Sequence, residues 1–329
     1  MLPLSYLKFQ KTGQVLTLSN NQAFDDVLFK GVDLVIFSRE CPFDLDRILS
    51  LREEFKFKLI VDVDDYWILY RKHFYYDAWK KHGIKERIIK AMKVADVVTT
   101  TNEKLKQKIL HHNPNVTLFP NAFPYGFDQF IKQPKLNQKN ILYAGGITHF
   151  EDLHSISHAL NRCRQNPIIQ REFKFVLAGY NGKTKETKNE WDRIVSVANE
   201  FGSCEIMDYL PPTHFMNHYK NGALCVAPLQ KNTFNQFKSD LKIVEAGCNA
   251  IPIIVSDLHP YNVIENPGVT ICKSQNDWYQ AFLRYSKAPE KLIEDGEALY
   301  EYVNKNYNLM DINKGRMALF QNITGNNTN

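Results

Sequence analysis

No run of about 20 uninterrupted apolar residues, the length that a membrane-spanning helix needs, occurs in this chain of 329 residues. The first residues, MLPLSYLKFQKTG, lack the continuous hydrophobic core of a secretory signal peptide. From these two absences we expect a soluble protein of the cytoplasm.

Cysteine is scarce and scattered, with six residues and no Cys-x-x-Cys pair. Structural zinc sites and thiol redox motifs bring cysteines together at such short spacings. We therefore interpret the cysteines as reduced core residues and expect no disulfide framework. They are Cys41, Cys163, Cys204, Cys225, Cys248 and Cys272.

The chain also has no large excess of charge of one sign, because its net charge is only +5. The exception is residues 71–93, which carry eight Lys or Arg and two acidic residues, interleaved with aromatic residues. Such a segment suits contact with a phosphate backbone and its bases, adsorption to an anionic membrane surface, or an ordinary solvated helix with aromatic residues packed beneath. The aromatic residues are Phe74, Tyr75, Tyr76 and Trp79.

Hydrophobic residues make up 44% of the chain, and 329 residues exceed the usual size of a single core, so we expect two domains. Short apolar runs alternate with stretches of helical periodicity, which is the pattern of a parallel α/β sheet. We therefore predict two Rossmann-like units in tandem. The expected strands lie at residues 15–18, 32–37, 58–63, 96–100, 116–119, 140–144, 173–178, 204–207, 224–227, 251–255 and 269–271.

Helices are expected between these strands, and a polar connection at residues 132–139 resembles a linker. We predict an N-terminal acceptor-side domain at 1–133, a nucleotide-sugar-binding domain at 134–309, and a crossover helix and tail at 310–329. The expected helices lie at residues 85–94, 104–111, 152–164, 186–201, 212–220, 240–248, 276–287 and 299–323.

The most informative stretch is residues 234–257, FNQFKSDLKIVEAGCNAIPIIVSD. Its pattern predicts a turn, an amphipathic helix and a buried strand in succession. We expect Ser239 to cap this helix. Lys238, Lys242 and Glu245 follow the i, i+4, i+7 spacing of one helix face.

That face suits a diphosphate, because a helix N-terminus offers free N–H groups and the positive end of a dipole. Lys238 and Lys242 would neutralise the phosphates. Glu245, about two turns further on, would accept hydrogen bonds from ribose hydroxyls. A solvated helix face with the same charges is the alternative interpretation.

Gly145 and Gly146 follow the expected strand at 140–144, at the edge where α/β sheets bind ligands. Glycine at that turn lets the backbone approach a phosphate closely, and Thr148 or His149 would hydrogen-bond it. The same glycines also suit a simple tight turn, so both interpretations stay open.

Three carboxylates gather at the end of the expected strand at 58–63. Alternation sends Asp62 and Asp64 to one face and Asp65 into the following turn. They suit a base for an acceptor hydroxyl, a divalent metal, or helix caps. We expect no metal, because the lysines already supply positive charge. Two further acceptor-side candidates follow the strand at 32–37, namely Arg39 and Glu40.

The pattern Phe-Asn-x-x-Lys-Ser-x-x-Lys-x-x-Glu, followed by Ile-Pro-x-Ile-x-Ser-Asp, resembles the donor motif of retaining GT-B-fold glycosyltransferases of the family-four type, in a bacterial and phage subgroup. The Gly-Gly turn with Thr-His, and FVLAGY with Gly179, resemble the same subgroup. The resemblance covers nearly all of residues 140–262 and is looser before them. Family members carry two glutamates here. Glu245 matches the second, whereas Phe237 stands at the first.

The resemblance implies the GT-B architecture, with two Rossmann-like domains facing each other across a cleft and a C-terminal helix that crosses back to the first domain. It also implies a nucleoside-diphosphate sugar as donor, most often a UDP- or GDP-sugar, with no cofactor required and with retention of configuration. Gly179 becomes a donor-site residue, and Tyr209 and Leu210 match the place where backbone groups hold the base.

We therefore predict a glycosyltransferase that moves a hexosyl or pentosyl group to a hydroxyl acceptor in the cytosol of a bacterium or a phage-infected host. Lys238 and Lys242 would stabilise the leaving diphosphate, and Asp64 and Asp65 are the catalytic candidates on the acceptor side. The acceptor is a polysaccharide or lipid-linked glycan, or a modified DNA base, contacted through residues 71–93. The alternative, motivated by Phe237, is a non-catalytic nucleotide- or nucleic-acid-binding protein on a degenerate GT-B scaffold.

Overall fold

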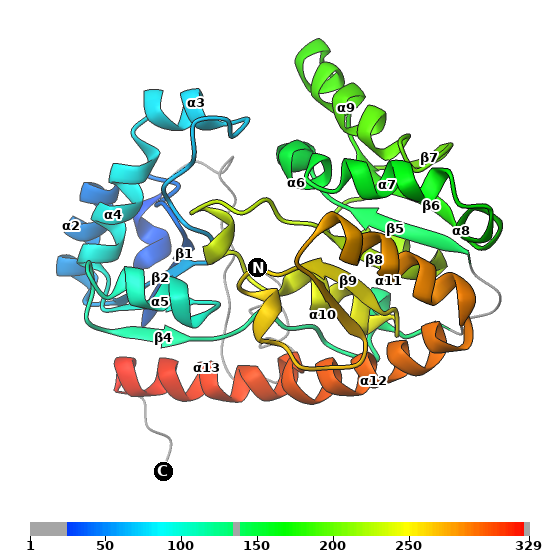
Figure 1. The fold of residues 1–329 in the computed structure, drawn as a ribbon. Coiled ribbons are helices and arrows are strands. Elements are labelled where there is room, and N and C mark those ends of the chain that lie inside the picture. The colour runs from blue at the N-terminus through cyan, green and yellow to red at the C-terminus, as the bar shows by residue number, and fades with distance from the viewer. Residues whose placement is uncertain (1–24, 134–138, 326–329) are drawn as a thin grey trace. The chain divides into compact units, whose positions relative to one another are not determined.

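The computed structural model of the protein describes residues 25–133 and 139–325 (Figure 1). Contacts divide the described chain into two compact units. Of the described residues, unit 1 holds those up to Ala122, the segment Phe237–Ser239 and those from Leu309 onward. Unit 2 holds Phe123–Gln236 and Asp240–Asn308. The chain therefore returns to unit 1 twice, first for a three-residue segment and then for its last helix.

In its described part, unit 1 contains a four-stranded parallel sheet in the order β1-β2-β3-β4 (Figure 1). The central strand β3 is buried at every position, which explains its continuous apolar and threonine-rich sequence. The strands are β1 (Leu34–Ser38), β2 (Lys58–Val63), β3 (Val97–Thr100) and β4 (Val116–Leu118).

Local sequence explains where two helices of unit 1 begin. The side chain of Asp44 accepts a hydrogen bond from the Asp46 amide at the start of α2, and Asn102 accepts one from the Leu105 amide at the start of α5. The apolar faces of the helices cover the sheet around Leu59 and other fully buried residues. The helices are α2 (Leu45–Phe55), α3 (Tyr76–Lys81), α4 (Ile84–Val94), α5 (Glu103–Ile109) and α13 (Leu309–Thr324).

Unit 2 contains, in its described residues, a six-stranded parallel sheet in the order β10-β9-β8-β5-β6-β7. The chain moves outward from β5 through β6 to β7, returns to β8 on the other side of β5, and continues to β10. The strand order therefore reverses between β5 and β8. The strands are β5 (Asn140–Ala144), β6 (Lys174–Tyr180), β7 (Cys204–Asp208), β8 (Gly222–Ala227), β9 (Ile253–Ser256) and β10 (Val269–Cys272).

Because the strand order reverses there, α10 lies on the face of the sheet opposite to α6, α7 and α8 (Figure 1). The core on one face is aromatic, with Trp191, Phe201 and Phe282 almost fully buried. The helices of unit 2 are α6 (Phe150–His154), α7 (Ser157–Arg164), α8 (Pro167–Glu172), α9 (Lys185–Ala198), α10 (Leu241–Cys248), α11 (Gln275–Lys287) and α12 (Glu290–Asn306).

Two parallel-sheet Rossmann-like units confirm the predicted fold class, and ten predicted strands appear within about two residues of their expected positions. The predicted strand at 15–18 and most of the linker at 132–139 lie outside the described residues. Within the described residues, no helix has the length and apolar character needed to cross a membrane.

The single helix predicted at 152–164 is wrong, because the chain forms α6 and α7 with a break between them. The side chain of Gln275 explains the break. It donates to the carbonyl of Ser155 and accepts from the amide of Ala159 at 2.8 Å. Those two groups would otherwise bond each other in a continuous helix.

The single helix predicted at 299–323 is also two helices, α12 and α13. The carbonyl of Tyr307 accepts a hydrogen bond from the amide of Phe123 at 3.1 Å, so the chain leaves the helical path there. The region predicted as a helix at 212–220 forms the 3₁₀ helix η4 (Phe215–Asn221) instead.

Candidate functional site

The carboxyl edge of the unit 2 sheet holds most of the predicted donor-site residues. The turn 145–149 follows β5, and the loop 228–236 follows β8, its neighbour in the sheet. Both loops therefore flank the point where the strand order reverses, which is the usual ligand position in open α/β sheets. Thr148 and His149 lie half-buried in this turn, in the 3₁₀ helix η3 (Ile147–His149).

The fold requires glycine at one of two positions on this edge and not at the other. Gly146 has an ordinary extended backbone with φ −101°, and a Cβ added to it would meet no atom within 4 Å. The fold therefore does not require glycine at this position. Gly179 has φ +102°, and its Cβ would lie 2.7 Å from the carbonyl oxygen of Gly145, so packing of the two turns requires glycine there.

Asp152 connects the two loops, although it is only 3% exposed. One carboxylate oxygen contacts Nδ1 of His149 at 2.8 Å. The other accepts from the amide of Gln230 at 2.8 Å and from Nδ2 of Asn235 at 2.7 Å. Since a carboxylate only accepts hydrogen bonds, His149 donates from Nδ1. This network fixes the shape of the edge before any ligand binds.

Helix α10 begins later than predicted, with Asp240 at its N-cap position. Lys238 precedes the helix, so the predicted helical spacing between Lys238 and Lys242 is wrong. The predicted cap is wrong too, because Ser239 accepts a hydrogen bond from Nδ2 of Asn121 at 2.8 Å and makes no cap to α10. Asparagine at 121 thus holds the segment that enters the helix.

A residue at the end of α12 holds the start of α10 in place. The Tyr307 hydroxyl donates to the carboxyl group of Asp240 at 2.5 Å. Burial raises the pKa of Asp240, and the Tyr307 hydrogen bond opposes that rise. Within the described residues, the amides of Leu241 and Lys242 donate no hydrogen bond, so the first turn keeps donors for an anion.

Glu245 lies in a buried polar cluster and not on an open helix face, being only 4% exposed. Its Oε2 accepts from the Tyr219 hydroxyl at 2.5 Å and from Nζ of Lys242 at 2.6 Å. Burial, followed by the charge of Glu245, raises the pKa of Tyr219 far above its ordinary value. His218, 6% exposed, lies beside this cluster. Burial and then the charge of Lys242 lower its pKa.

Phe237 and Lys238 belong to unit 1 by their contacts. Nδ2 of Asn102 donates to the carbonyls of Phe237 at 3.0 Å and Lys238 at 3.3 Å. The Phe237 ring packs on Tyr66 with a centroid distance of 4.3 Å and is 7% exposed. An apolar side chain at this position is therefore explained by packing inside unit 1.

The segment predicted to hold a nucleotide base follows β7, the edge strand of the sheet. The amide of Tyr209 donates to the carbonyl of Tyr180 at 2.8 Å, which fixes the backbone at the carboxyl end of β7. The Tyr209 ring is 51% exposed, and Leu210 is half-buried. An exposed aromatic ring at this edge is suited to stacking on a planar ligand.

In unit 1, three of the predicted charged residues come together at the carboxyl ends of β1 and β2. Nε of Arg39 forms an ion pair with Asp64 at 2.9 Å, and the amide of Arg39 donates to the carbonyl of Asp62 at 2.7 Å. Glu40 pairs with Arg87 of α4 at 2.7 Å. Asp65 lies in the turn that follows, as predicted.

Asp62 has a more enclosed position than Asp64. It accepts from the Thr99 hydroxyl at 2.5 Å, and burial raises its pKa against that hydrogen bond. Burial likewise lowers the pKa of Arg316 on α13 to about 10, while the nearby charge of Asp62 raises it. Asp62 therefore lies close enough to α13 for its charge to act on Arg316.

Metal-ligating side chains do not gather in the described part of the chain. There, no group of three or more His, Cys, Asp or Glu side chains is arranged to hold a metal ion. The cysteines within these residues are all free thiols.

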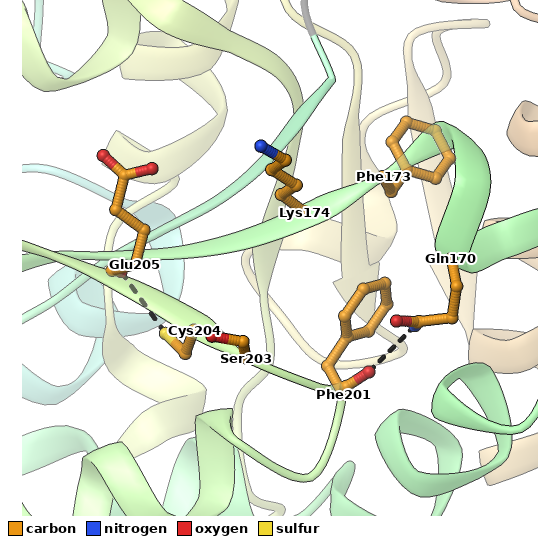
Figure 2. A pocket seen from close by; sticks show the side chains of 7 residues that line it. All are labelled: Gln170, Phe173, Lys174, Phe201, Ser203, Cys204 and Glu205. Carbon is orange, nitrogen blue, oxygen red and sulfur yellow. Dashed lines mark hydrogen bonds between the residues drawn. The ribbon is translucent and has the colours of Figure 1, made fainter.

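A cavity of about 410 Å³ opens at the amino ends of β6 and β7 (Figure 2). Figure 2 shows Lys174 at the start of β6, Glu205 near the start of β7, and the ring of Phe201 beside Gln170. The Gln170 side chain donates to the carbonyl of Phe201 at 2.9 Å, so its polar group is used by the fold. This cavity is at the sheet edge opposite to the predicted site, and we assign no ligand to it.

The sequence did not assign a role to several residues that shape the edge. Asp152, Asn235, Tyr219 and Tyr307 each hold a predicted site residue or the loop beside it. Their partners lie between 3 and 83 positions away in sequence. Only the pair His149 and Asp152, three residues apart, offered a local signal.

The family model of glycosyl transferases group 1 matches residues 138–287. Sucrose-phosphate synthase from Thermosynechococcus elongatus superposes with a TM-score of 0.66 at 14% identity, covering 90% of this chain and 75% of that chain. No protein of curated function matches the sequence.

Two further solved structures are similar. TarM from S. aureus, in complex with fondaparinux, alpha-GlcNAc-glycerol and UDP, has a TM-score of 0.62 at 16% identity, over 89% of this chain and 57% of that chain. HepE from Anabaena, in complex with UDP, has a TM-score of 0.61 at 12% identity, over 88% and 79%. The chain thus has the GT-B fold, and its residues 138–287 match the family model of glycosyl transferases group 1.

Proposed function

We propose that this protein is a glycosyltransferase, which moves a hexosyl or pentosyl group from a nucleoside-diphosphate sugar to a hydroxyl acceptor. The observation that carries the proposal is the edge between β5 and β8. It combines an open position at Gly146, amides at the start of α10 that donate no hydrogen bond to any described residue, and the cluster of Lys242 and Glu245. The match to the family model of glycosyl transferases group 1 covers all of these residues, which supports the proposal.

The donor's diphosphate would bind at the turn 145–149 and the start of α10. Backbone amides and Lys242 would carry its charge, with Lys238 as a second cation. Glu245 would accept hydrogen bonds from the ribose, and the segment with Tyr209 and Leu210 would hold the base. UDP in the TarM and HepE complexes makes UDP the first nucleotide to test, with GDP as the second.

The chemistry follows from the charges. When the bond between the sugar and the diphosphate breaks, negative charge grows on the phosphates, and the fixed lysines and amides stabilise it more than they stabilise the bound donor. We propose that no metal ion is required. Retention of configuration follows from the family resemblance, and Asp64 and Asp65 are the proposed catalytic groups for the acceptor hydroxyl.

The proposed acceptor is anionic, because of residues 71–93. In this segment Arg87 and Lys90 are paired with Glu40 and Asp46. Four exposed cations between residues 71 and 81 form no ion pair with any described residue, and Tyr75 beside them is 47% exposed. A lipid-linked or polymeric glycan and a modified base in DNA both fit this surface. The four cations are Arg71, Lys72, Lys80 and Lys81.

A salt titration separates these acceptors. Binding to DNA would weaken steeply with salt concentration, with a slope that falls when the four cations are replaced by alanine. Vesicles with anionic lipids are the second arm of the same titration. Binding to neither, at low salt, would remove this surface from the acceptor site.

A second function is favoured by Phe237 alone. The family's first glutamate is absent, and the ring is packed inside unit 1. A protein that senses a nucleotide or nucleic acid without transferring a sugar would also fit this feature. Sugar release from UDP- or GDP-sugars, measured beside calorimetric binding, distinguishes the two: binding without any release of sugar favours the sensor.

The donor site is tested by Gly146→Val. The backbone is extended and the Cβ position is open, so we expect an unchanged unfolding temperature. The branched side chain would occupy the space of a phosphate, and we expect UDP affinity to fall by more than about tenfold, or about 1.4 kcal/mol. Gly146→Ala should give a smaller loss. Equal UDP affinity in all three proteins would contradict the site.

Lys242→Ala is the second test, with Lys291→Ala as its matched control. Both lysines pair with a glutamate three residues later on a helix of unit 2, at 2.6 Å and 2.5 Å. Only Lys242 lies at the proposed site. We expect loss of UDP affinity in the first variant alone.

A further inference from the structure

A buried carboxylate at the β5–β8 edge joins two loops and does not reach a substrate itself. Asp152 is 3% exposed, whereas the side chain of its partner His149 is 23% exposed. Its three hydrogen bonds come from the turn after β5 and from the loop after β8. These are the two loops that flank the proposed diphosphate site.

Stability alone does not explain a carboxylate in this position. Burying a charge costs free energy unless a countercharge and hydrogen bonds offset the cost. In the described residues no Lys or Arg forms an ion pair with Asp152, and only His149 is close enough to share its charge. Apolar residues of similar volume often serve a buried position as well or better.

The loop after β8 is held at a second point by the same network. Asn235 is 2% exposed, and its Nδ2 donates both to Asp152 at 2.7 Å and to the carbonyl of Gln230 at 2.9 Å. The loop therefore closes on itself around the carboxylate. It then leads directly into Phe237 and Lys238, so its position sets where the chain enters that segment.

We propose that Asp152 is a positioning residue of the transfer reaction. It fixes the ring orientation and the Nδ1–H tautomer of His149, and it holds the loop after β8 against the turn after β5. Both loops then meet the donor diphosphate in one arrangement, without reorganisation at the moment of transfer. This role rests on the proposed glycosyltransferase function.

Asp152→Asn tests the role, because an amide keeps the size of the side chain but cannot accept from all three donors. We expect kcat to fall on the order of 100-fold, while KM for the sugar nucleotide changes less than about threefold. Asp192→Asn is the control. That aspartate is exposed on α9, where it pairs with Lys188 at 2.7 Å.

The tautomer of His149 gives a readout that needs no activity. Two-bond ¹H–¹⁵N spectra of protein labelled at its ten histidines, with His149 assigned from His149→Gln, report which ring nitrogen carries the proton. We expect Nδ1–H in the parent protein and in Asp192→Asn, and a changed pattern in Asp152→Asn.

Asn235→Ala covers the case in which Asp152→Asn does not fold. It removes one tie between the loops and leaves the contact of His149 with Asp152, so we expect lower kcat with an unchanged tautomer. Unchanged kcat or an unchanged tautomer in Asp152→Asn would overturn the positioning role while leaving a working transferase. If Asp152→Asn does not fold, unchanged kcat in Asn235→Ala would overturn it. A parent protein that binds no sugar nucleotide would instead overturn the proposed function.

Discussion

Glu245 has a structural role and a proposed ligand-binding role, and a substitution at this residue separates the two. In Glu245→Ala the buried Tyr219 hydroxyl loses its acceptor, which costs roughly 1–3 kcal/mol of unfolding free energy. Because the same change removes the proposed acceptor for the ribose hydroxyls, we expect it also to weaken the binding of UDP to the folded protein. Glu294→Ala, in an exposed pair with Lys291, should cost less than about 1 kcal/mol and leave UDP affinity unchanged.

Urea unfolding and calorimetry on the same protein samples measure the two losses. If the Glu245→Ala protein unfolds more easily but binds UDP as tightly as the parent protein, Glu245 has a structural role only.

His218 should make stability depend on pH. Its Nδ1 is buried with no partner in the described residues, and burial followed by the charge of Lys242 lowers its pKa below the ordinary 6.5. Below pH 6.5 the unfolded chain therefore binds a proton that the folded protein resists, and stability is lost as pH falls from 6.5 toward the lowered pKa.

His218→Asn removes this contribution. We expect the parent protein to lose more unfolding free energy than the variant between pH 7.5 and pH 5.5. Asp62 and Asp240, whose pKa values are raised by burial, titrate in both proteins and cancel in the difference. A variant with the same pH dependence as the parent would show that His218 is accessible to protons in the folded state.

At the scale of elements, the contact of α10 with α12 sets where the candidate site lies. A Cβ on Gly247 would stand 2.7 Å and 2.8 Å from the two methyl carbons of Val303. Gly247→Ala gains about 1 kcal/mol of helix propensity, but overpacking costs roughly 1–3 kcal/mol. We expect a net loss of stability and weaker UDP binding, because α10 must shift.

Val303→Ala supplies the matching test, since it removes both methyl groups. In the double variant Gly247→Ala/Val303→Ala, we expect the interaction between the two changes to be favourable in a double-mutant cycle measured by urea unfolding. Strictly additive effects would mean that the helices do not pack as closely as described.

The strands were predictable because buried parallel strands are short apolar runs that end at turn residues. The helix breaks were not, because their causes are distant. Gln275 takes up the helical hydrogen-bonding groups between α6 and α7. The amide of Phe123 bonds the carbonyl of Tyr307 between α12 and α13. No local pattern near either break announces these partners.

The candidate site divides in the same way. Gly146, Lys242 and Glu245 were predicted as site residues from short motifs, since a turn and a helix start have local signatures. The predicted cap by Ser239 was wrong because Asn121, 118 residues away, binds its hydroxyl. Asn235 and Tyr219 acquire their roles only from tertiary contacts.

At the scale of the whole molecule, unit 1 is assembled from separate stretches of sequence. Helix α13 places Arg316 near Asp62 and over the ring of Phe119, at 5.0 Å. Gly315 of the same helix lies against that ring. Removing residues 309–329 would uncover Phe119 and Asp62 and leave Arg39 as the remaining cation near Asp62.

We expect the truncated chain to lose cooperative unfolding of unit 1 while unit 2 still unfolds as one transition. Scanning calorimetry of the full and truncated chains measures this directly. A truncated protein with both transitions intact would show that α13 is dispensable for unit 1.

The account depends most on the position of the nucleotide, and a crystal structure with UDP or GDP bound tests it directly. We predict the diphosphate against Gly146 and the first turn of α10, with the ribose within hydrogen-bond distance of Glu245. A nucleotide in the cavity at the amino ends of β6 and β7, or no bound nucleotide at saturating concentration, would contradict the account.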